Sequence, residues 1–166
     1  MLINQKVLFN ESECQLIIDL NKTNLKQWNT NEYKYNSMGI LYSNETKWIF
    51  DRLKEYFVSQ TNVNIVSLKE EIHFHTYKIG DSFLRHNDAK KNRIYGVGVL
   101  LNEEFMGGDF IFYDKNPEII NKIKGNSYVF DVITNHEIKP IINGIRHSLL
   151  WFLDNNNIKI SKTNLL

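Results

Sequence analysis

The sequence has one cysteine, two prolines and no long apolar run, and each of these shortages excludes a class of protein. Cys14 has no partner in the chain, which excludes an intrachain disulfide and a disulfide-stapled secreted scaffold. Two prolines and eight glycines exclude collagen-like and Pro/Gly-rich disordered chains. The most apolar stretch, residues 145–153, contains Arg146 and His147 and is far shorter than the roughly 20 residues that span a bilayer.

Charge of one sign and targeting segments are also scarce. The formal net charge is +1, which argues against a polybasic nucleic-acid binder and against an acidic disordered tail. Residues 1–11 contain no apolar run of signal-peptide length. We therefore expect a protein of the cytoplasm, where thiols stay reduced, without a membrane partner.

Apolar and aromatic residues, in contrast, are plentiful. The 166 residues are 42% hydrophobic and 13% aromatic, which is enough for a sizeable core in one domain. We expect a single domain over residues 1–166, with helical support over about 1–62 and a strand-rich core over about 63–160. Residues 158–166, after an Asn-rich stretch, are expected either to form a last strand or to fray.

Two segments near the start have apolar residues at helical spacing. Residues 11–26 are expected to form a helix in which Asn10 or Ser12 is the N-cap. Residues 44–60 are expected to form a second helix with Asn44 as the N-cap.

Short runs of β-branched and aromatic residues, separated by turn residues, indicate strands. These are expected near residues 70–79, 83–87, 93–101, 108–113, 126–131, 135–141 and 145–153, and residues 33–43, between the two helices, are expected to be extended. Asn143-Gly144 lies between two apolar runs, which favours a two-residue hairpin turn. Two helices that precede about seven short strands predict a mainly β protein: a sandwich or jelly roll with the helices packed on one side.

The tripeptide His86-Asn87-Asp88 is the first sign of chemistry. On a strand, residues i and i+2 point to the same face, so an imidazole and a carboxylate would point together. His136 lies far enough along the chain for intervening strands to bring it back beside them. Two imidazoles and one carboxylate hold Fe(II) and leave coordination positions open for substrate and oxygen.

Arg146 follows His136 by ten positions, across the expected Asn143-Gly144 turn. In such a hairpin, its guanidinium would lie deeper than the metal and would bind the distal carboxylate of a five-carbon 2-oxo acid. Ser148 is two residues further along the strand, so it would share that face and donate a hydrogen bond to the same carboxylate.

The stretch from Phe74 to Leu153 resembles the 2-oxoglutarate/Fe(II) dioxygenases of the prolyl 4-hydroxylase-like group. Order and spacing agree over about 80 residues, half of the chain, and the N-terminal helix is similar too. The matching residues are Tyr77, Gly80, His86, Asp88, Leu101-Asn102, Gly107-Gly108, Gly125, Tyr128 to Phe130, His136, Pro140 and Gly144-Ile145-Arg146.

The resemblance implies a double-stranded β-helix (jelly-roll) core. It also implies Fe(II) held by His86, Asp88 and His136, and 2-oxoglutarate anchored by Arg146, with O2 as the second co-substrate and ascorbate as an optional reductant. Tyr77 matches the tyrosine that hydrogen-bonds 2-oxoglutarate in the family.

Two departures from the family pattern concern the co-substrate. Arg146 stands where many collagen-type members carry lysine, although other branches have arginine there. Leu100 stands where some members place a second co-substrate tyrosine, and Ser148 is the expected substitute.

The activity implied is hydroxylation of an unactivated C–H bond, with formation of succinate and CO2. A prolyl residue in a peptide or protein is the expected substrate. A free amino acid or another protein side chain stays open, and nucleic acid is disfavoured because there is no basic stripe. Two alternatives of other classes are a metal-binding isomerase or storage barrel and a catalytically idle, peptide-binding jelly roll.

Further polar residues have plainer expected roles. His73 and His75 are expected to be ordinary strand histidines on the face of Tyr77, and His147 a surface or packing residue opposite Arg146. Lys90, Lys91 and Arg93 are expected to form a solvated loop, with contact to an acidic or phosphorylated substrate as the alternative. Phe152 should share the face of Arg146, and Trp151 should pack outside against a helix.

Overall fold

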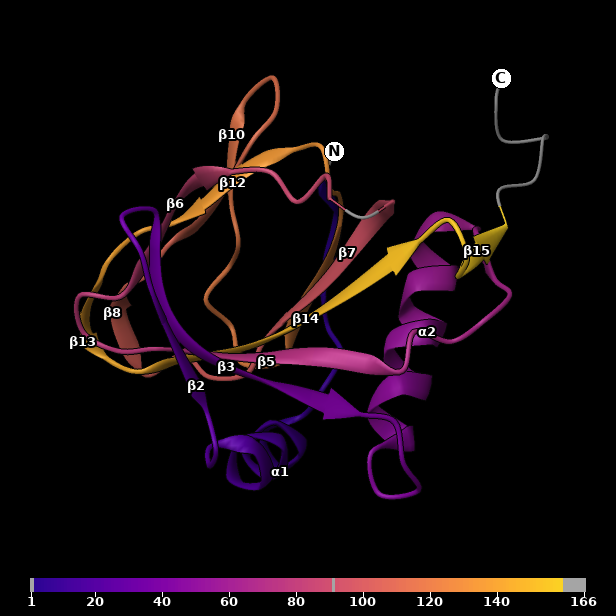
Figure 1. The fold of residues 1–166 in the computed structure, drawn as a ribbon, viewed down its shortest axis with the longest axis horizontal. Helices are drawn as coiled ribbons and strands as arrows, with labels where there is room; N and C mark the ends of the chain where they lie inside the picture. Colours follow the sequence, from indigo (N-terminus) through magenta and orange to yellow (C-terminus); the bar gives the residue numbers. More distant parts are fainter. Residues whose placement is uncertain (1, 91, 160–166) are drawn as a thin grey trace.

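The computed structural model describes residues 2–90 and 92–159, which fold into two helices and fifteen strands (Figure 1). The helices are α1 (Glu11–Asn21) and α2 (Lys47–Thr61). The strands are β1 (Leu2–Val7), β2 (Lys26–Asn29), β3 (Tyr33–Leu41), β4 (Asn64–Ile65), β5 (Glu71–Tyr77), β6 (Ser82–His86), β7 (Arg93–Leu100), β8 (Phe105–Gly107), β9 (Phe110–Tyr113), β10 (Pro117–Ile119), β11 (Asn126–Asp131), β12 (Asn135–Ile138), β13 (Ile141–Gly144), β14 (Arg146–Asp154) and β15 (Ile158–Lys159).

Eleven strands form one curled antiparallel sheet. Ten follow the order β1-β11-β7-β14-β5-β3-β6-β12-β9-β10, and β2 pairs with β3. Strand β3 pairs with β5 over most of its length and with β6 at its start, so it joins two layers. We call β1-β11-β7-β14-β5-β3 the major layer and β6-β12-β9-β10 the minor layer. The predicted mainly β architecture with N-terminal helices is confirmed.

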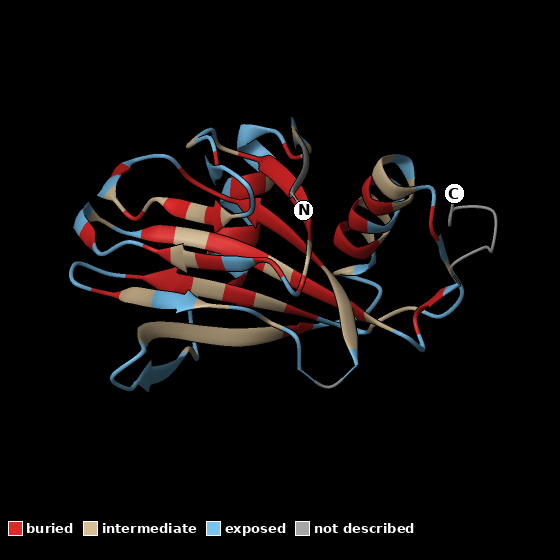
Figure 2. Cartoon of the chain, turned by 90° about the horizontal axis from the view of Figure 1, so that it is seen from above, coloured by how far each residue is buried: buried red, intermediate tan, exposed pale blue. Residues whose placement is uncertain are grey.

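Side chains of the major layer alternate between two environments, as the period of two in a strand requires. On β14, Leu149, Trp151 and Leu153 join the core beneath the helices, whereas Phe152 and its same-face neighbours point between the layers. Both helices lie on the side of the major layer that faces away from β6 and β12 (Figure 1). Buried residues run along the stacked strands, and exposed residues gather in the connecting loops (Figure 2).

Helix α1 begins as predicted and ends earlier than predicted. The Asn10 side chain accepts a hydrogen bond from the Glu13 backbone, and the Glu13 carboxylate accepts one from the Asn10 backbone, each at 2.9 Å. This capping box fixes the start of the helix. The predicted extension to residue 26 is wrong, because Lys26–Asn29 pairs with β3 as strand β2, and tertiary pairing overrides local helix propensity.

Helix α2 begins at Lys47, and the predicted cap at Asn44 is wrong. Thr46 is the N-cap, but its hydroxyl donates to the Leu41 carbonyl at 2.6 Å rather than capping the helix. The C-cap is Asn62, which adopts the left-handed conformation that Asn tolerates better than most residues. Neither of the two described helices has both the length and the apolarity needed to cross a bilayer.

The predicted hairpin turn at Asn143-Gly144 is wrong. Residues 141–144 form β13, which pairs with β8, and the chain then enters β14 between β5 and β7. Gly144 has φ of +77°, and a Cβ there would lie 2.6 Å from the Glu104 carbonyl oxygen. The positive φ of Gly144 therefore serves a bend where the chain passes from β13 into β14. Strands β12 and β14 are not neighbours in the sheet.

Several short strands were not expected from the sequence: β1, β2, β4, β8, β10 and β13. Of the chain end, Ile158–Lys159 pairs with Asn64–Ile65, while residues 160–166 lie outside the described residues. The first 62 residues thus contribute strands as well as helices, and β3 is central to the sheet.

Candidate metal and co-substrate site

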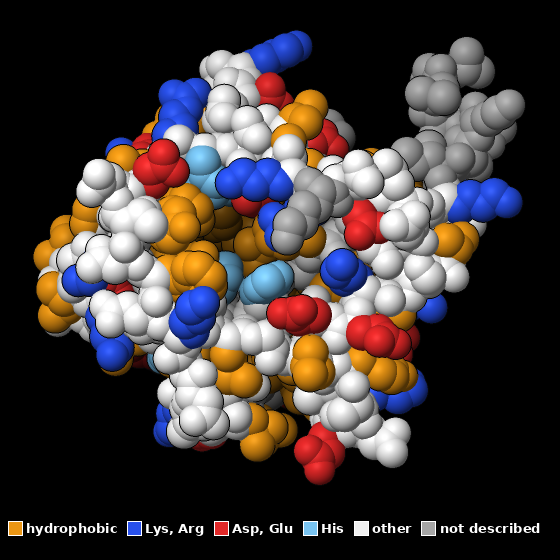
Figure 3. Space-filling view, in the orientation of Figure 1, with side chains coloured by type: hydrophobic (Ala, Val, Ile, Leu, Met, Phe, Trp, Pro, Cys, Tyr) orange, Lys and Arg blue, Asp and Glu red, His pale blue; other side chains and the backbone are white. Residues whose placement is uncertain are grey.

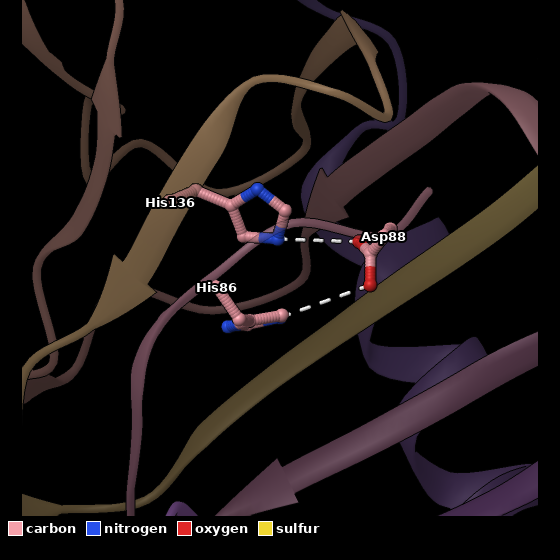
Figure 4. A group of neighbouring side chains, drawn as sticks. All are labelled: His86, Asp88 and His136. Carbon is pink, nitrogen blue, oxygen red and sulfur yellow. Dashed lines mark ion pairs between the residues drawn. The ribbon is translucent and has the colours of Figure 1, made fainter. Parts of the chain in front are cut away.

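His86, Asp88 and His136 come together at one end of the minor layer (Figure 4). His86 ends β6 and is the register partner of His136 on β12. The i, i+2 argument assumed that Asp88 lies on the strand with His86, but Asp88 lies in the loop after β6. Its backbone N–H donates to the Val132 carbonyl at 2.8 Å. The ligand atoms of all three residues lie within 4.8 Å of one another.

Both imidazoles are oriented by their own strands. Nδ1 of His86 lies 2.7 Å from the Leu84 carbonyl oxygen, and Nδ1 of His136 lies 2.9 Å from that of Thr134. A carbonyl oxygen only accepts hydrogen bonds, so each Nδ1 carries a proton and each ring turns its Nε2 towards the Asp88 carboxylate. This is how metal-binding histidines are usually held.

The two Nε2 atoms face the Asp88 carboxylate. Nε2 of His136 is 3.2 Å from Oδ2 of Asp88, and Nε2 of His86 is 3.7 Å from Oδ1. Oδ2 is buried and, within the described ranges, has no hydrogen-bond partner. Three electron-pair donors that converge on one another require a cation between them, so this donor set fits a divalent metal such as Fe(II).

The surroundings of the triad are aromatic. The His86 ring stacks on Phe83 at 3.6 Å between centroids, and the His136 ring lies 5.2–5.4 Å from the rings of Phe110, Phe112 and Phe130. Burial, with the neighbouring His136, lowers the pKa of His86 and keeps it neutral.

The Asp88 carboxylate stays ionised in this setting. Burial acts to raise the pKa of Asp88, but the His136 and His86 rings outweigh burial and hold that pKa below its ordinary value. An ionised carboxylate is the form of Asp88 that metal binding requires.

Arg146 is the most deeply buried charge near the triad, with 2% of its surface exposed. Its Nη1 donates to the Ser148 hydroxyl at 2.8 Å, which leaves the hydroxyl proton of Ser148 available for another acceptor. Within residues 2–90 and 92–159, no carboxylate lies within 4.0 Å of the Arg146 guanidinium. A buried unpaired cation is costly, so the site is built to receive an anion.

Tyr77 is the register partner of Arg146 on β5, and its ring centroid lies 5.5 Å from the guanidinium carbon. Arg146 and Ser148, predicted to share one face of a strand, are in contact, and Tyr77, which the resemblance places at the co-substrate, lies beside them. They meet through pairing of β14 with β5, however, and not through the predicted hairpin with His136.

Tyr128 is a second buried tyrosine beside Arg146, and its part in the site was not foreseen. Its register partner on β7 is Gly98, and a Cβ on Gly98 would lie 2.1 Å from the carbon that bears the Tyr128 hydroxyl. Only glycine leaves room for this ring. Burial raises the pKa of Tyr128 and the Arg146 charge opposes that rise, so the phenol stays protonated. A strand glycine that faces an aromatic residue was the available signal.

Gly107-Gly108 borders the same space. Gly108 has φ of +62°, and a Cβ there would lie 2.4 Å from the Ile141 side chain and 3.5 Å from Cδ of Arg146. The pair thus lets the chain turn tightly against the stem of Arg146.

The triad and the Arg146 group open into one cavity of about 220 Å³ between the layers. Figure 3 shows a hollow in this view with histidine and hydrophobic side chains at its surface. His73 and His75 lie on β5, as expected, outside the triad, and the face that they share with Tyr77 forms part of the cavity wall. His147 lies on the opposite face, where Nδ1 is 3.0 Å from the Thr76 hydroxyl, as expected.

The expected solvated loop is corrected in part. Lys90 and Arg93 line the cavity, and Lys91 lies outside the described residues. Phe152 lines the cavity, and Trp151 packs outward with its ring centroid 6.4 Å from that of Phe50 on α2, both as predicted.

No family model matches the sequence, and no curated protein matches it. Solved structures do match. A prolyl-4-hydroxylase from Pseudomonas putida is 18% identical, with a TM-score of 0.73, over 92% of each chain. A viral collagen prolyl hydroxylase from Paramecium Bursaria Chlorella virus-1, in complex with 2OG, is 17% identical, with a TM-score of 0.72, over 90% of this chain and 94% of that one.

A third similar structure is a Trichoplax adhaerens prolyl hydroxylase in complex with a peptide fragment of the hypoxia inducible factor oxygen degradation domain. It is 18% identical, with a TM-score of 0.73, over 92% of this chain and 83% of that one. The likeness spans nearly the whole chain in each case and confirms, for the fold, the resemblance noted in the sequence. This chain has the jelly-roll fold of the prolyl hydroxylases and related 2OG-Fe(II) oxygenases.

Proposed function

We propose that this protein is an Fe(II)- and 2-oxoglutarate-dependent dioxygenase that hydroxylates an unactivated C–H bond, with a prolyl residue in a peptide or protein as the favoured substrate. The observation that carries the proposal is a single cavity that joins two groups of side chains. One is a converging triad of two imidazoles and a carboxylate, and the other is a buried guanidinium with a hydroxyl and a tyrosine beside it.

His86, Asp88 and His136 are the proposed iron ligands. Iron bound there would supply the activation of O2 and the oxidative decarboxylation of 2-oxoglutarate to succinate and CO2. The residues around it have simpler tasks. The carbonyls of Leu84 and Thr134 hold both imidazoles in the ligand tautomer.

Arg146 is the proposed anchor of 2-oxoglutarate. Its guanidinium would receive the distal carboxylate, and Ser148, which already accepts from Arg146, would donate its free proton to that group. Tyr77 and Tyr128 would add phenol donors from either side. Tyr128 would thereby take the role of the second co-substrate tyrosine, for which position 100 has a leucine.

Hydrophobic rings exclude water from the reaction. Phe83, Phe110 and Phe130 surround the imidazoles, and a dry pocket strengthens each polar contact inside it. A free, buried thiol at Cys14 and a ferrous cofactor both suit a reducing compartment, so the cytoplasm remains part of the proposal.

The prolyl substrate has weaker support than the oxygenase class. It is supported by the fold shared with three prolyl hydroxylases, one of them bound to a peptide. Fold similarity alone does not specify substrate. A free amino acid is the second candidate, and the cavity wall favours it with polar groups, His73 and Arg93, beside the triad.

The test is succinate formation from 2-oxoglutarate with Fe(II), ascorbate and air, first without a further substrate and then with Pro-containing peptides. We expect slow uncoupled turnover that one peptide accelerates. His86→Ala should abolish turnover, and Arg146→Lys should raise the KM for 2-oxoglutarate, because lysine keeps the charge but lacks the planar fork.

The outcomes separate the alternatives. Turnover that no peptide accelerates would keep the oxygenase and move the substrate search to free amino acids. Absence of turnover in a protein that binds both Fe(II) and 2-oxoglutarate would favour the catalytically idle, peptide-binding jelly roll. Failure to bind 2-oxoglutarate would favour a metal-binding isomerase or storage barrel.

A further inference from the structure

The cavity has a guanidinium at each end. Arg146 and Phe152 lie on the same face of β14, six residues apart, which is roughly 20 Å along a strand. At the Phe152 end, the guanidinium carbon of Arg93 lies 3.7 Å from the centre of the Phe152 ring. The Arg146 end is the proposed binding site of 2-oxoglutarate, whereas Arg93 has no part in that proposal.

Arg93 is held in place but is not neutralised. Stacking on Phe152 fixes the plane of the guanidinium and leaves its N–H edge free to donate. In the described part of the chain, no carboxylate lies within 4.0 Å of the guanidinium nitrogens. Nearby, Asp154 is already paired with Lys69 at 3.7 Å.

The Arg93 end adjoins the triad. Arg93, Phe152 and His73 line the main cavity together with Asp88, and the same three residues line a second recess of about 220 Å³ that opens outward past Glu71. The positive charge of Arg93 is among the influences that lower the pKa of Asp88, in keeping with this proximity. A group bound at Arg93 would therefore lie beside the reacting centre.

His73 adds a polar contact without adding charge. Burial lowers the pKa of His73, so its ring is neutral near pH 7 and offers one donor and one acceptor. It stands between the triad and the recess, at the register position opposite Leu150. The wall beside Arg93 is thus suited to a polar group rather than to a purely apolar one.

We propose that Arg93, stacked on Phe152 and flanked by His73, forms a subsite for a carboxylate of the substrate, close to the carbon that is hydroxylated. This rests on the proposed oxygenase function and narrows its substrate class. A planar carboxylate matches the fork of one guanidinium. A phosphate dianion would meet only this arginine and the exposed Lys90, near the negative charge of Asp88.

Two sources of the carboxylate are tested in parallel, each with a neutral isostere. L-proline is compared with L-prolinamide, and N-acetyl-Pro-Asp-amide with N-acetyl-Pro-Asn-amide. Binding is measured calorimetrically in protein that contains Mn(II) and 2-oxoglutarate without oxygen, and stimulation of succinate formation is measured with Fe(II) in air. The first pair reports a free amino acid, and the second reports an acidic peptide.

We expect the acid of one pair to bind at least about ten-fold more tightly than its amide. Arg93→Gln should remove that preference, and Arg93→Lys should keep part of it, while the KM for 2-oxoglutarate stays unchanged in both. Glu71→Gln is the matched control: it removes a negative charge at the mouth of the recess and should preserve or increase the preference for the acid.

Equal responses to acids and amides, including no response to either, would overturn the proposal, as would a preference that survives Arg93→Gln. A change in the KM for 2-oxoglutarate would also overturn it, because Arg93 would then be a general structural residue. Uncoupled succinate formation by the unmodified protein tests the oxygenase separately, so the two failures are distinguishable.

Discussion

Strand β14 lies between two regions of similar burial and opposite character. Towards the helices it presents Leu149, Trp151 and Leu153, each at most 1% exposed and packed among apolar residues. Towards the minor layer it presents Arg146 and Ser148, which are also buried and are hydrogen-bonded to each other at 2.8 Å. The helix-side core is hydrophobic, whereas the cavity side gathers a buried cation and a buried hydroxyl, and buried polar groups of this kind mark a binding site.

The largest effect should come from the cavity side. Asp88→Asn keeps the shape of the side chain and removes its charge, so affinity for Fe(II) or Mn(II) should fall by more than about 100-fold, beyond what outer-shell partners contribute. Titration calorimetry measures this. Asp81→Asn is the control, because Asp81 is buried but serves a turn through the Lys78 backbone at 2.9 Å. Equal metal affinities for the two variants would contradict the assignment.

On the helix side, Trp151→Ala should reduce the free energy of unfolding by about 3–5 kcal/mol, because a fully buried ring leaves a cavity in a close-packed core. Its indole N–H, which donates to the Lys69 carbonyl at 2.9 Å, is lost as well. Phe152→Ala, one residue along, should cost less because its ring borders an existing cavity. Urea denaturation measures the free energy of unfolding of both variants. Equal losses would contradict the claim that the two faces of β14 differ in packing.

Two tyrosine hydroxyls sharpen the comparison further. Tyr128→Phe should raise the Kd for 2-oxoglutarate about ten-fold, as expected for a lost hydrogen bond to a charged group, and leave stability nearly unchanged. Tyr56→Phe is the opposite case, because the Tyr56 hydroxyl donates to the Ser127 carbonyl at 2.8 Å beneath the helices. It should lower stability by about 1 kcal/mol and leave the Kd unchanged. Reversal of this pattern would refute the role of Tyr128.

The smallest effect concerns pH. Burial, aided by the charge of Arg146, lowers the pKa of His147 to about 4. The unfolded chain therefore takes up this proton first, so stability is complete above about pH 6.5 and is lost as the pH falls towards 4. At pH 5.5 the loss from His147 should be about 1 kcal/mol. His147→Asn should flatten the unfolding free energy over this window, and parallel curves for the two proteins would contradict the argument.

The sequence was sufficient to predict the grouping of His86, Asp88 and His136, and of Tyr77 with Arg146. In the first case the strand period of two and the spacing to His136 carried the information, and in the second the family resemblance did. The strand runs around residues 71–77, 93–100 and 126–131 followed the same alternation and were placed within a few residues.

The errors share one physical origin. A strand pattern shows which residues share a face, but not which strand lies beside it or which face encloses a cavity. His136 and Arg146 were therefore placed on one hairpin, although their strands belong to different layers. For the same reason the sequence placed His73 and His75 on the correct face but did not show that this face lines the cavity. The role of Tyr128 was missed because Gly98, the strand glycine that signals it, becomes informative only once the register that pairs the two residues is known.

The position of β14 also has a consequence for how the molecule is made. This strand is near the end of the chain, yet it is inserted between β5 and β7, which are synthesised much earlier. Until β14 emerges from the ribosome, both earlier strands present unpaired edges, the feature that promotes aggregation of nascent chains. Because His136 lies on β12, we expect metal to bind only after this strand has been synthesised, and not to guide the folding of the earlier strands.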